Sequence, residues 1–250
     1  MILYFSGTGN SRYVAEVIGR RLGDKVISLN DLLRRGRRSR FTSDKRFVIV
    51  CPIYVSRMPL ELEQYLMKCR FEGTRDIWFV FTCAGGMGGA WRYCRTLAAR
   101  KNLIYHGTGC LIMPTNYVVL MNVIPKDQAK EQARLVLPEV IRIADTIAEG
   151  GELTSSAKVR RWTHSSDWAE FFHRLLIRDR LFHADSKCIG CGKCAMICPR
   201  GDIYMEDGRP HWQGRCMHCM ACISACPVKA INYGHLTQKR NRYYLMDEGK

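Results

Sequence analysis

Eight of the thirteen cysteines lie in one C-terminal stretch and follow the same spacing twice. Each run reads Cys-x2-Cys-x2-Cys-x3-Cys-Pro, and Cys188 of the first run recurs 28 positions later as Cys216. These are the spacings of the bacterial iron–sulfur run, in which cysteine thiolates bind the iron of a cluster. The positions are Cys188, Cys191, Cys194 and Cys198, then Cys216, Cys219, Cys222 and Cys226.

The fourth cysteine of each run determines how the eight cysteines are divided between two clusters. In two-cluster ferredoxins it binds the other cluster, which predicts two crossed [4Fe–4S] sites. Zinc sites use paired Cys-x2-Cys units with a longer gap, and c-type haem needs His where Met220 stands. We expect His218, between two ligands, beside a cluster or at the surface. Residues 184–235 resemble bacterial two-cluster ferredoxins. The expected ligand sets are Cys188, Cys191, Cys194 and Cys226, and Cys216, Cys219, Cys222 and Cys198.

The elements before these cysteines alternate between strand and helix. Apolar runs predict strands at residues 2–6, 25–29, 46–51, 76–83 and 109–113, and helical periodicity predicts helices at 11–22, 59–69, 89–101 and 127–149. This pattern predicts an α/β fold, a doubly wound parallel sheet with helices on both faces. In such sheets ligands bind outside the carboxyl ends of the strands, where the strand order reverses.

A glycine-containing hexapeptide, SGTGNS, follows the first predicted strand at that edge. Its glycines let the backbone approach an anion, and the next helix offers its N-terminal N–H groups. Its polar side chains add further donors. A turn with a helix cap is the alternative for such a segment. The residues are Ser6, Gly7, Thr8, Gly9, Asn10 and Ser11.

Residues that are absent from this loop exclude two classes of phosphate-containing ligand. A nucleoside triphosphate loop ends in Gly-Lys-Ser/Thr, whereas the first lysine of this chain is Lys25. A dinucleotide loop needs a third glycine where Arg12 stands, although Asp31 occupies the approximate place of a ribose-binding acid. Hydroxyl and amide donors without a cation predict a small phosphate monoester.

The stretch ILYFSGTGNSRYVA resembles the phosphate loop of flavodoxins, which bind FMN. The resemblance implies that two later loops hold the isoalloxazine ring, commonly with an aromatic stacked on it, for which Tyr54 is the candidate. Packing against Pro52 or Pro59 is the alternative role for Tyr54. The chain departs from flavodoxins in its basic charge and its glycine-rich TCAGGMGGAW loop. The other residues implied to bind FMN are Pro52, Ile53, Val55, Thr82, Cys83, Ala84, Gly85, Gly86, Asn116 and Tyr117.

The two regions together resemble a prokaryotic ferredoxin family with an N-terminal flavodoxin-like domain and a C-terminal two-[4Fe–4S] bacterial-type domain. The resemblance implies a flavodoxin-like five-stranded sheet plus a small α+β ferredoxin-like domain. We expect the FMN-binding domain at residues 1–150, a helical connector at 151–183, and the ferredoxin domain with a C-terminal extension at 184–250. An aromatic-basic face for nucleic acid or membrane is the alternative for the connector. Its large apolar residues are Trp162, Trp168, Phe171, Phe172, Leu175, Leu176 and Phe182.

Charge indicates the expected partners. The chain has 39 Lys and Arg against 23 Asp and Glu, a net charge of +16, with its densest run at residues 34–40. Such a run is either a nucleic-acid contact or a solvated surface. Two oxidised clusters and one phosphate monoester would lower the net charge to about +10. We therefore expect redox partner proteins, such as an acidic ferredoxin or a reductase, in preference to nucleic acid.

The expected function is electron transfer between two [4Fe–4S] clusters and FMN, without a separate catalytic residue. One alternative is a flavin-dependent reductase of a small acceptor, such as a quinone or nitro compound, and another is a redox-sensing nucleic-acid binder. No apolar run reaches the roughly 18 residues that cross a bilayer. The N-terminus reads as a first strand in place of a signal peptide, so we expect a cytoplasmic location.

The remaining cysteines fall mostly on predicted strands and helices, where a free cysteine is commonly a small buried hydrophobe. Cys51 and Cys83 lie at strand ends near the expected flavin, and these two are the candidates for reactivity. The full set is Cys51, Cys69, Cys83, Cys94 and Cys110.

Overall fold

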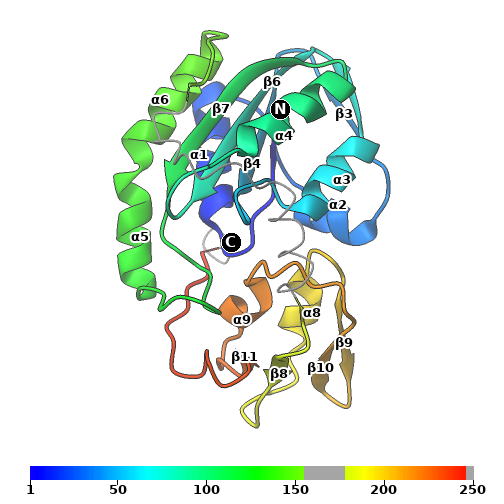
Figure 1. Cartoon of the computed structure of the whole chain (residues 1–250), viewed down its shortest axis with the longest axis vertical. Helices are drawn as coiled ribbons and strands as arrows, with labels where there is room; N and C mark the ends of the chain where they lie inside the picture. The colour runs from blue at the N-terminus through cyan, green and yellow to red at the C-terminus, as the bar shows by residue number, and fades with distance from the viewer. Residues whose placement is uncertain (155–177, 246–250) are drawn as a thin grey trace.

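The N-terminal region is a parallel sheet of five strands with helices on both faces (Figure 1). The computed structural model describes residues 1–154 and 178–245. The strand order is β2-β1-β4-β6-β7, which is the 2-1-3-4-5 order of flavodoxin-like doubly wound folds. The predicted fold class is therefore confirmed. The strands are β1 (Ile2–Tyr4), β2 (Val26–Ser28), β4 (Phe47–Pro52), β6 (Asp76–Cys83) and β7 (Ile104–Ile112).

Both faces of the sheet are buried because its strands carry apolar side chains in both directions. Leu3 and Phe5 of the first strand and its extension pack on the face that α3 and α4 cover. Ile2 and Tyr4 point to the opposite face, against α1 and α6. The helices are α1 (Asn10–Leu22), α2 (Asn30–Arg35), α3 (Leu60–Lys68), α4 (Ala90–Arg100), α5 (Lys126–Leu135) and α6 (Leu137–Ala148).

Several elements differ from the sequence-based expectation. The single helix predicted at 127–149 is two helices, α5 and α6, which meet at Val136. Pro138 stands in the first turn of α6, and its ring cannot follow an uninterrupted helix because it clashes with the carbonyl four residues earlier. A small parallel pair, β3 (Arg40–Ser43) and β5 (Arg70–Gly73), and the short helix α2 were not predicted. The strand predicted at 109–113 begins earlier, at Ile104.

The C-terminal region below the sheet consists of short strands and helices that repeat one another (Figure 1). Antiparallel pairs join β8 to β11 and β9 to β10. The helices α8 and α9 start 28 positions apart, at Lys193 and Ala221, as the cysteine repeat requires. The elements are β8 (Phe182–Ala184), α8 (Lys193–Ile197), β9 (Ile203–Glu206), β10 (Arg209–Trp212), α9 (Ala221–Ala225) and β11 (Ile231–Tyr233).

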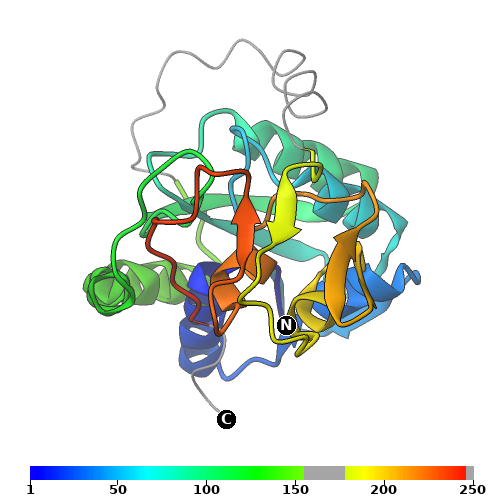
Figure 2. The same ribbon diagram turned by 90° about the horizontal axis from the view of Figure 1, so that it is seen from below.

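The last described residues tie the two regions together. Residues 237–245 run from the C-terminal region back to α1 (Figure 2). The Arg240 guanidinium donates to the carbonyl oxygens of Val118 and Val119 at 2.7 and 2.8 Å, and the Leu245 N–H donates to the Thr8 carbonyl at 2.7 Å. Most of the connector expected at 151–183, including its tryptophans, falls on residues 155–177 and lies outside the described residues.

Part of the arginine run also contributes internal contacts. Arg34 donates to the backbone carbonyl of Met196 in α8, and Arg40 forms an ion pair with Glu72 at 3.2 Å. Arg35, Arg37 and Arg38 are exposed. The run therefore joins the two regions through Arg34, and its middle faces solvent.

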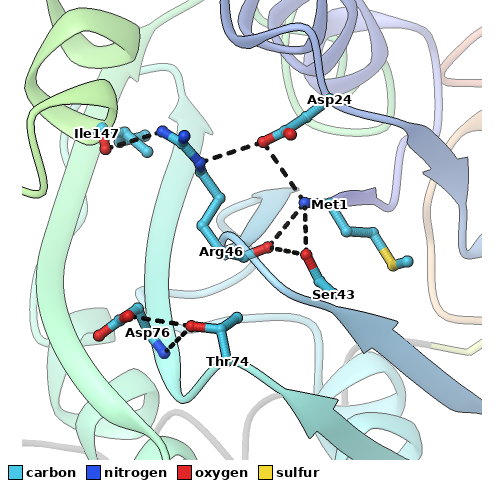
Figure 3. Close-up of polar contacts among 7 residues, drawn as sticks. All are labelled: Met1, Asp24, Ser43, Arg46, Thr74, Asp76 and Ile147. Carbon is cyan, nitrogen blue, oxygen red and sulfur yellow. Dashed lines mark hydrogen bonds and ion pairs between the residues drawn. The ribbon is translucent and has the colours of Figure 1, made fainter.

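A polar network closes the amino end of the sheet (Figure 3). The Met1 ammonium group donates to the Arg46 carbonyl at 2.7 Å and lies 3.6 Å from the Asp24 carboxylate. The Arg46 guanidinium pairs with Asp24 at 3.3 Å and donates to the Ile147 carbonyl at 3.1 Å. This network is at the opposite end of the strands from the loops that follow them. Across the two described ranges, no helix has the length and apolarity to cross a membrane.

Candidate cofactor cavity and cysteine clusters

A cavity of about 350 Å³ opens at the carboxyl edge of the sheet. Its wall includes Ser6 after β1, Tyr54 after β4, Cys83 at the end of β6 and Asn116 after β7. β1 and β4 are the neighbours at which the strand order reverses, the position where doubly wound folds bind ligands. The volume lies in the range of roughly 300–1,000 Å³ that holds small cofactors.

The SGTGNS loop is buried at one end of this cavity, and protein groups contact its polar side chains. The Gly9 N–H donates to the Ser6 hydroxyl at 3.1 Å, and the Asn116 amide donates to the Thr8 hydroxyl at 2.7 Å. The Ser6 hydroxyl lines the cavity and still carries a proton to donate, whereas the Thr8 hydroxyl is fully buried and also contacts Tyr243. The Asn10 amide is held by the Pro114 carbonyl and the Tyr243 hydroxyl, both at 2.9 Å.

The backbone of the loop provides the donors that a phosphate requires. Within residues 1–154 and 178–245, no acceptor takes the amide N–H of Gly7, Thr8 or Asn10. Asn10 begins α1, so these N–H groups lie at the positive end of a helix dipole. The loop therefore fits an anionic phosphate through backbone groups and the Ser6 hydroxyl.

The loop after β4 carries an aromatic side chain and a strained backbone. The Tyr54 ring meets Phe5 edge to face, with centroids 6.5 Å apart. Burial raises the pKa of Tyr54 above its ordinary value. The buried hydroxyl has no hydrogen-bond partner among the described residues. Val55 has a φ of 49°, a conformation that a β-branched residue adopts only under constraint, often at functional sites.

The eight repeated cysteines line two separate cavities in the C-terminal region. We call the first the proximal set, because residues between its members also line the large cavity, and the second the distal set. Each set combines three cysteines of one run with the fourth of the other run. The proximal set is Cys198, Cys216, Cys219 and Cys222, and the distal set is Cys188, Cys191, Cys194 and Cys226.

The backbone around the two sets repeats closely. Cys198 and Cys226 end α8 and α9 with φ of −65° and −64°. The Asp202 N–H donates to the Cys198 sulfur at 3.3 Å, and the Ala230 N–H donates to the Cys226 sulfur at 3.2 Å. Hydrogen bonds of this kind stabilise thiolates that bind iron–sulfur clusters and tune their potentials.

Two thiols of the proximal set, those of Cys219 and Cys222, are buried. No group of three or more His, Cys, Asp or Glu side chains in the described ranges is arranged to hold one metal ion. Burial raises the pKa of the Cys219 thiol to about 12 and also raises that of Cys222. Coordination to iron removes the thiol proton outright, so metal binding offsets the cost of a buried thiolate.

The large cavity and the proximal set share a wall. Met217 and His218, which lie between Cys216 and Cys219, line the large cavity. His218 is 3% exposed, its Nδ1 lies 3.0 Å from the Tyr117 hydroxyl, and its Nε2 lies 2.8 Å from the Arg178 carbonyl. His218 is therefore buried at the boundary between the two regions.

Most of the residues predicted to bind a flavin meet around the cavity, but four do not line it. Thr8, Gly9, Gly85 and Gly86 lie outside the lining, although Thr8 and Gly9 belong to the buried loop. Sequence reasoning missed the cavity residues that come from the stretch after β7 and from the proximal motif. The signal available was only that each stretch adjoins a predicted site residue. The missed residues are Pro114, Thr115, Leu120, Met121, Met217 and His218.

Comparison with known proteins separates the two regions. Residues 180–241 match the model of the 4Fe-4S dicluster domain family. A pyruvate synthase subunit PorD of Methanothermobacter marburgensis is 42% identical over 45 residues, covering 18% of this chain and 53% of the relative. An uncharacterized ferredoxin of Methanocaldococcus jannaschii is 38% identical over 50 residues, covering 18% and 65%. The chain thus spans about half to two thirds of the length of these relatives.

Solved structures similar to the N-terminal region include flavodoxins. A short-chain flavodoxin associated with a non-canonical PDU bacterial microcompartment has a TM-score of 0.32 and 14% identity, covering 57% of this chain and 96% of that one. The two-electron reduced flavodoxin of Megasphaera elsdenii has a TM-score of 0.30 and 14% identity, covering 57% and 99%. The fold assignment itself rests on the strand order. The chain combines an N-terminal flavodoxin-like fold with a C-terminal 4Fe-4S dicluster ferredoxin domain.

Proposed function

We propose that this protein transfers electrons between FMN and two [4Fe–4S] clusters within one chain. The observation that carries the proposal is the wall shared by the large cavity and the proximal cysteine set, formed by Met217 and His218. Close approach of redox centres favours electron transfer over any route that would require two chains to meet. The cofactors supply the redox chemistry, and the protein positions them and tunes their potentials.

FMN is the cofactor that the large cavity fits best. The phosphate would bind the backbone N–H groups of the SGTGNS loop and the hydroxyl of Ser6. The ring would lie between the loops after β4 and β6, where Tyr54 and Cys83 line the cavity. When bound, FMN can store one or two electrons, whereas each cluster exchanges one.

The two cysteine sets would hold the two clusters with crossed ligands. Each set has the four thiolates that a [4Fe–4S] cluster needs, gathered around one cavity. The proximal cluster would exchange electrons with the flavin, and the distal cluster with an external partner. Cys191 of the distal set is exposed, which gives a partner access to that end.

The expected partner is an acidic redox protein. The chain carries a net charge of +16, and Lys187 and Lys193 flank the distal cysteines. Complementary charge speeds the encounter of redox proteins and orients them. An acidic ferredoxin or reductase therefore suits this end of the molecule.

Reduction of a small acceptor at the flavin is the second candidate function. Leu120 and Met121 line the large cavity and are 71% and 48% exposed, so two apolar side chains of its wall reach solvent. A planar quinone or nitro compound would bind such a surface. Turnover of one acceptor well above the rate with free FMN would support this function.

The first experiment counts the cofactors. After anaerobic purification, two clusters and one flavin predict about eight iron atoms, about eight sulfides and one FMN per chain. Eight irons without flavin, even after FMN is added back, would remove the flavin part of the proposal. Four irons would remove the two-cluster part.

The second experiment tests the route. A low-potential donor should reduce the flavin quickly in the wild type and at least about tenfold more slowly in Cys191→Ala, which lacks one distal ligand. Cys69→Ala is the matched control, because Cys69 is buried in the core beneath the sheet and lines neither cysteine cavity. Equal flavin reduction in both variants would contradict entry through the distal cluster.

A further inference from the structure

Two cysteines outside the cluster motifs meet beside the large cavity. Cys83 ends β6 and Cys110 lies in β7, and their sulfur atoms are 3.1 Å apart. In the strand register Cys83 faces Ile112 and Phe81 faces Cys110, so the two cysteines are diagonal neighbours on one face of the sheet. Cys110 was not expected to be reactive, because its neighbour is 27 positions away in the sequence.

The environment of the pair distinguishes its two members. Cys83 lines the large cavity, and its sulfur accepts a hydrogen bond from the Gly86 N–H at 3.1 Å. The contact with Cys110 lowers the pKa of the Cys83 thiol, and the N–H groups of Gly86 and Gly85 contribute to the shift. The same contact raises the pKa of Cys110. Cys83 is therefore the member of the pair that more readily forms the thiolate, the reactive form.

We propose that Cys83 and Cys110 form a reversible dithiol–disulfide couple in the cavity wall, in which Cys83 attacks low-molecular-weight disulfides. The Cys83 thiolate attacks one sulfur of the disulfide, which forms a mixed disulfide and releases one thiolate. Cys110 then loses its proton and attacks the Cys83 sulfur, which closes the protein disulfide and releases the second thiolate. The protein pair loses two electrons, and the small disulfide gains them as two thiols.

The surrounding structure can accommodate the bond. A disulfide is about 2.05 Å long, so the sulfur atoms must approach by roughly 1 Å. Cys83 is followed by Ala84, Gly85 and Gly86, and no atoms lie within 4 Å of a Cβ at either glycine. This loop can therefore follow Cys83, and closing the bond moves part of the cavity wall toward β7.

The experiment equilibrates the anaerobic holoprotein with glutathione buffers of increasing disulfide content. Free thiols are then alkylated and the peptides are identified by mass spectrometry. We expect a peptide pair linked through Cys83 and Cys110 that disappears when the buffer is made reducing. At pH 7 we also expect Cys83 to be alkylated at least about tenfold faster than Cys110, because it has more thiolate.

Three variants separate the roles of the two sulfurs. In Cys110→Ser the reaction should stop at a mixed disulfide between Cys83 and glutathione. Cys83→Ser should form neither this mixed disulfide nor the internal disulfide. Cys94→Ala is the matched control, a buried cysteine of α4, and should keep the Cys83–Cys110 link. Equal slow alkylation of both cysteines, with no linked peptide in the most oxidising buffer, would overturn the proposal. FMN and iron are counted in the same samples, so failure of this couple is distinguishable from failure of the electron-transfer function.

Discussion

A methyl group on Gly7 would overlap the backbone carbonyl oxygen of Cys219. Gly7 belongs to the loop that the structure offers to a phosphate, and Cys219 belongs to the proximal cysteine set. The contact between these two residues brings the candidate flavin cavity against the candidate cluster, with no side chain between the two backbones.

Gly7→Ala should therefore separate the two sites. The added methyl group meets backbone, which cannot move as a flexible side chain would, so we expect a cost of about 1–3 kcal/mol. We predict loss of most bound FMN and faster loss of iron on exposure to a chelator, measured by absorbance. Gly85→Ala is the control, because its Cβ would meet open space. Normal FMN and iron retention in Gly7→Ala would contradict this contact.

Crossed ligation predicts which cluster each fourth cysteine supports. Cys198→Ala should damage the cluster held by Cys216, Cys219 and Cys222, and Cys226→Ala the other one. Both variants should fall from about eight to about four irons, with different remaining spectra in electron paramagnetic resonance. In Cys198→Ala the flavin should no longer be reduced quickly, because the damaged cluster is the proximal one. The spectrum left in Cys198→Ala should match that of Cys219→Ala, and a match to Cys191→Ala would contradict the crossed arrangement.

Tyr54 offers a test of the flavin ring's position. Tyr54→Ala removes the aromatic surface from the cavity wall and should weaken FMN binding at least about tenfold, or about 1.4 kcal/mol. Tyr54→Phe should bind FMN as the wild type does, since the buried hydroxyl has no hydrogen-bond partner among the described residues. Fluorescence titration of flavin-stripped protein measures both. If Tyr54→Phe weakened FMN binding as much as Tyr54→Ala, the hydroxyl would be the group that matters. If neither variant weakened FMN binding, the flavin ring would lie away from Tyr54.

The network at the amino end of the sheet should affect stability alone. Arg46→Met leaves the buried Asp24 carboxylate with the Met1 ammonium group as its remaining described ion-pair partner. We expect a loss of about 1–3 kcal/mol, and each kcal/mol lowers the Tm by about 2–4 °C in a chain of this size. FMN and iron contents should not change. Arg38→Met, at an exposed position of the arginine run, should leave the Tm within about 1 °C, and a similar fall there would attribute the effect to net charge.

Charge should control the encounter with an acidic redox partner. Raising ionic strength screens charges beyond roughly 10 Å, so reduction by an acidic ferredoxin should slow several-fold in stopped-flow measurements. Lys187→Glu, beside the distal set, should slow it at low salt more than Lys45→Glu, which makes the same charge change near the amino end of the sheet. Equal effects of the two variants would mean that net charge, and no particular surface, governs the encounter.

The sequence by itself predicted the cluster cysteines and the order of strands and helices, because both depend on residues that are close together in the chain. The cysteines from Cys188 to Cys198 lie on one short segment, so their spacing can be recognised without tertiary information. An apolar stretch such as β6 is likewise recognised as a buried strand from its own residues. The fold class and the 28-residue repeat could therefore be predicted from the sequence. The predicted helix boundaries were wrong where a single residue interrupts the helical periodicity, as Pro138 does between α5 and α6.

The tertiary structure decided which distant residues share a site. Tyr243 holds Asn10 across 233 positions, so the side chains expected to face a phosphate are partly occupied by the chain's own last described residues. His218 and Met217 reach the large cavity, and Cys110 reaches Cys83, only because the strand order and the docking of the C-terminal region place them there. Local sequence patterns indicate which residues are buried and which form turns, whereas contacts between separate elements depend on how the whole chain packs.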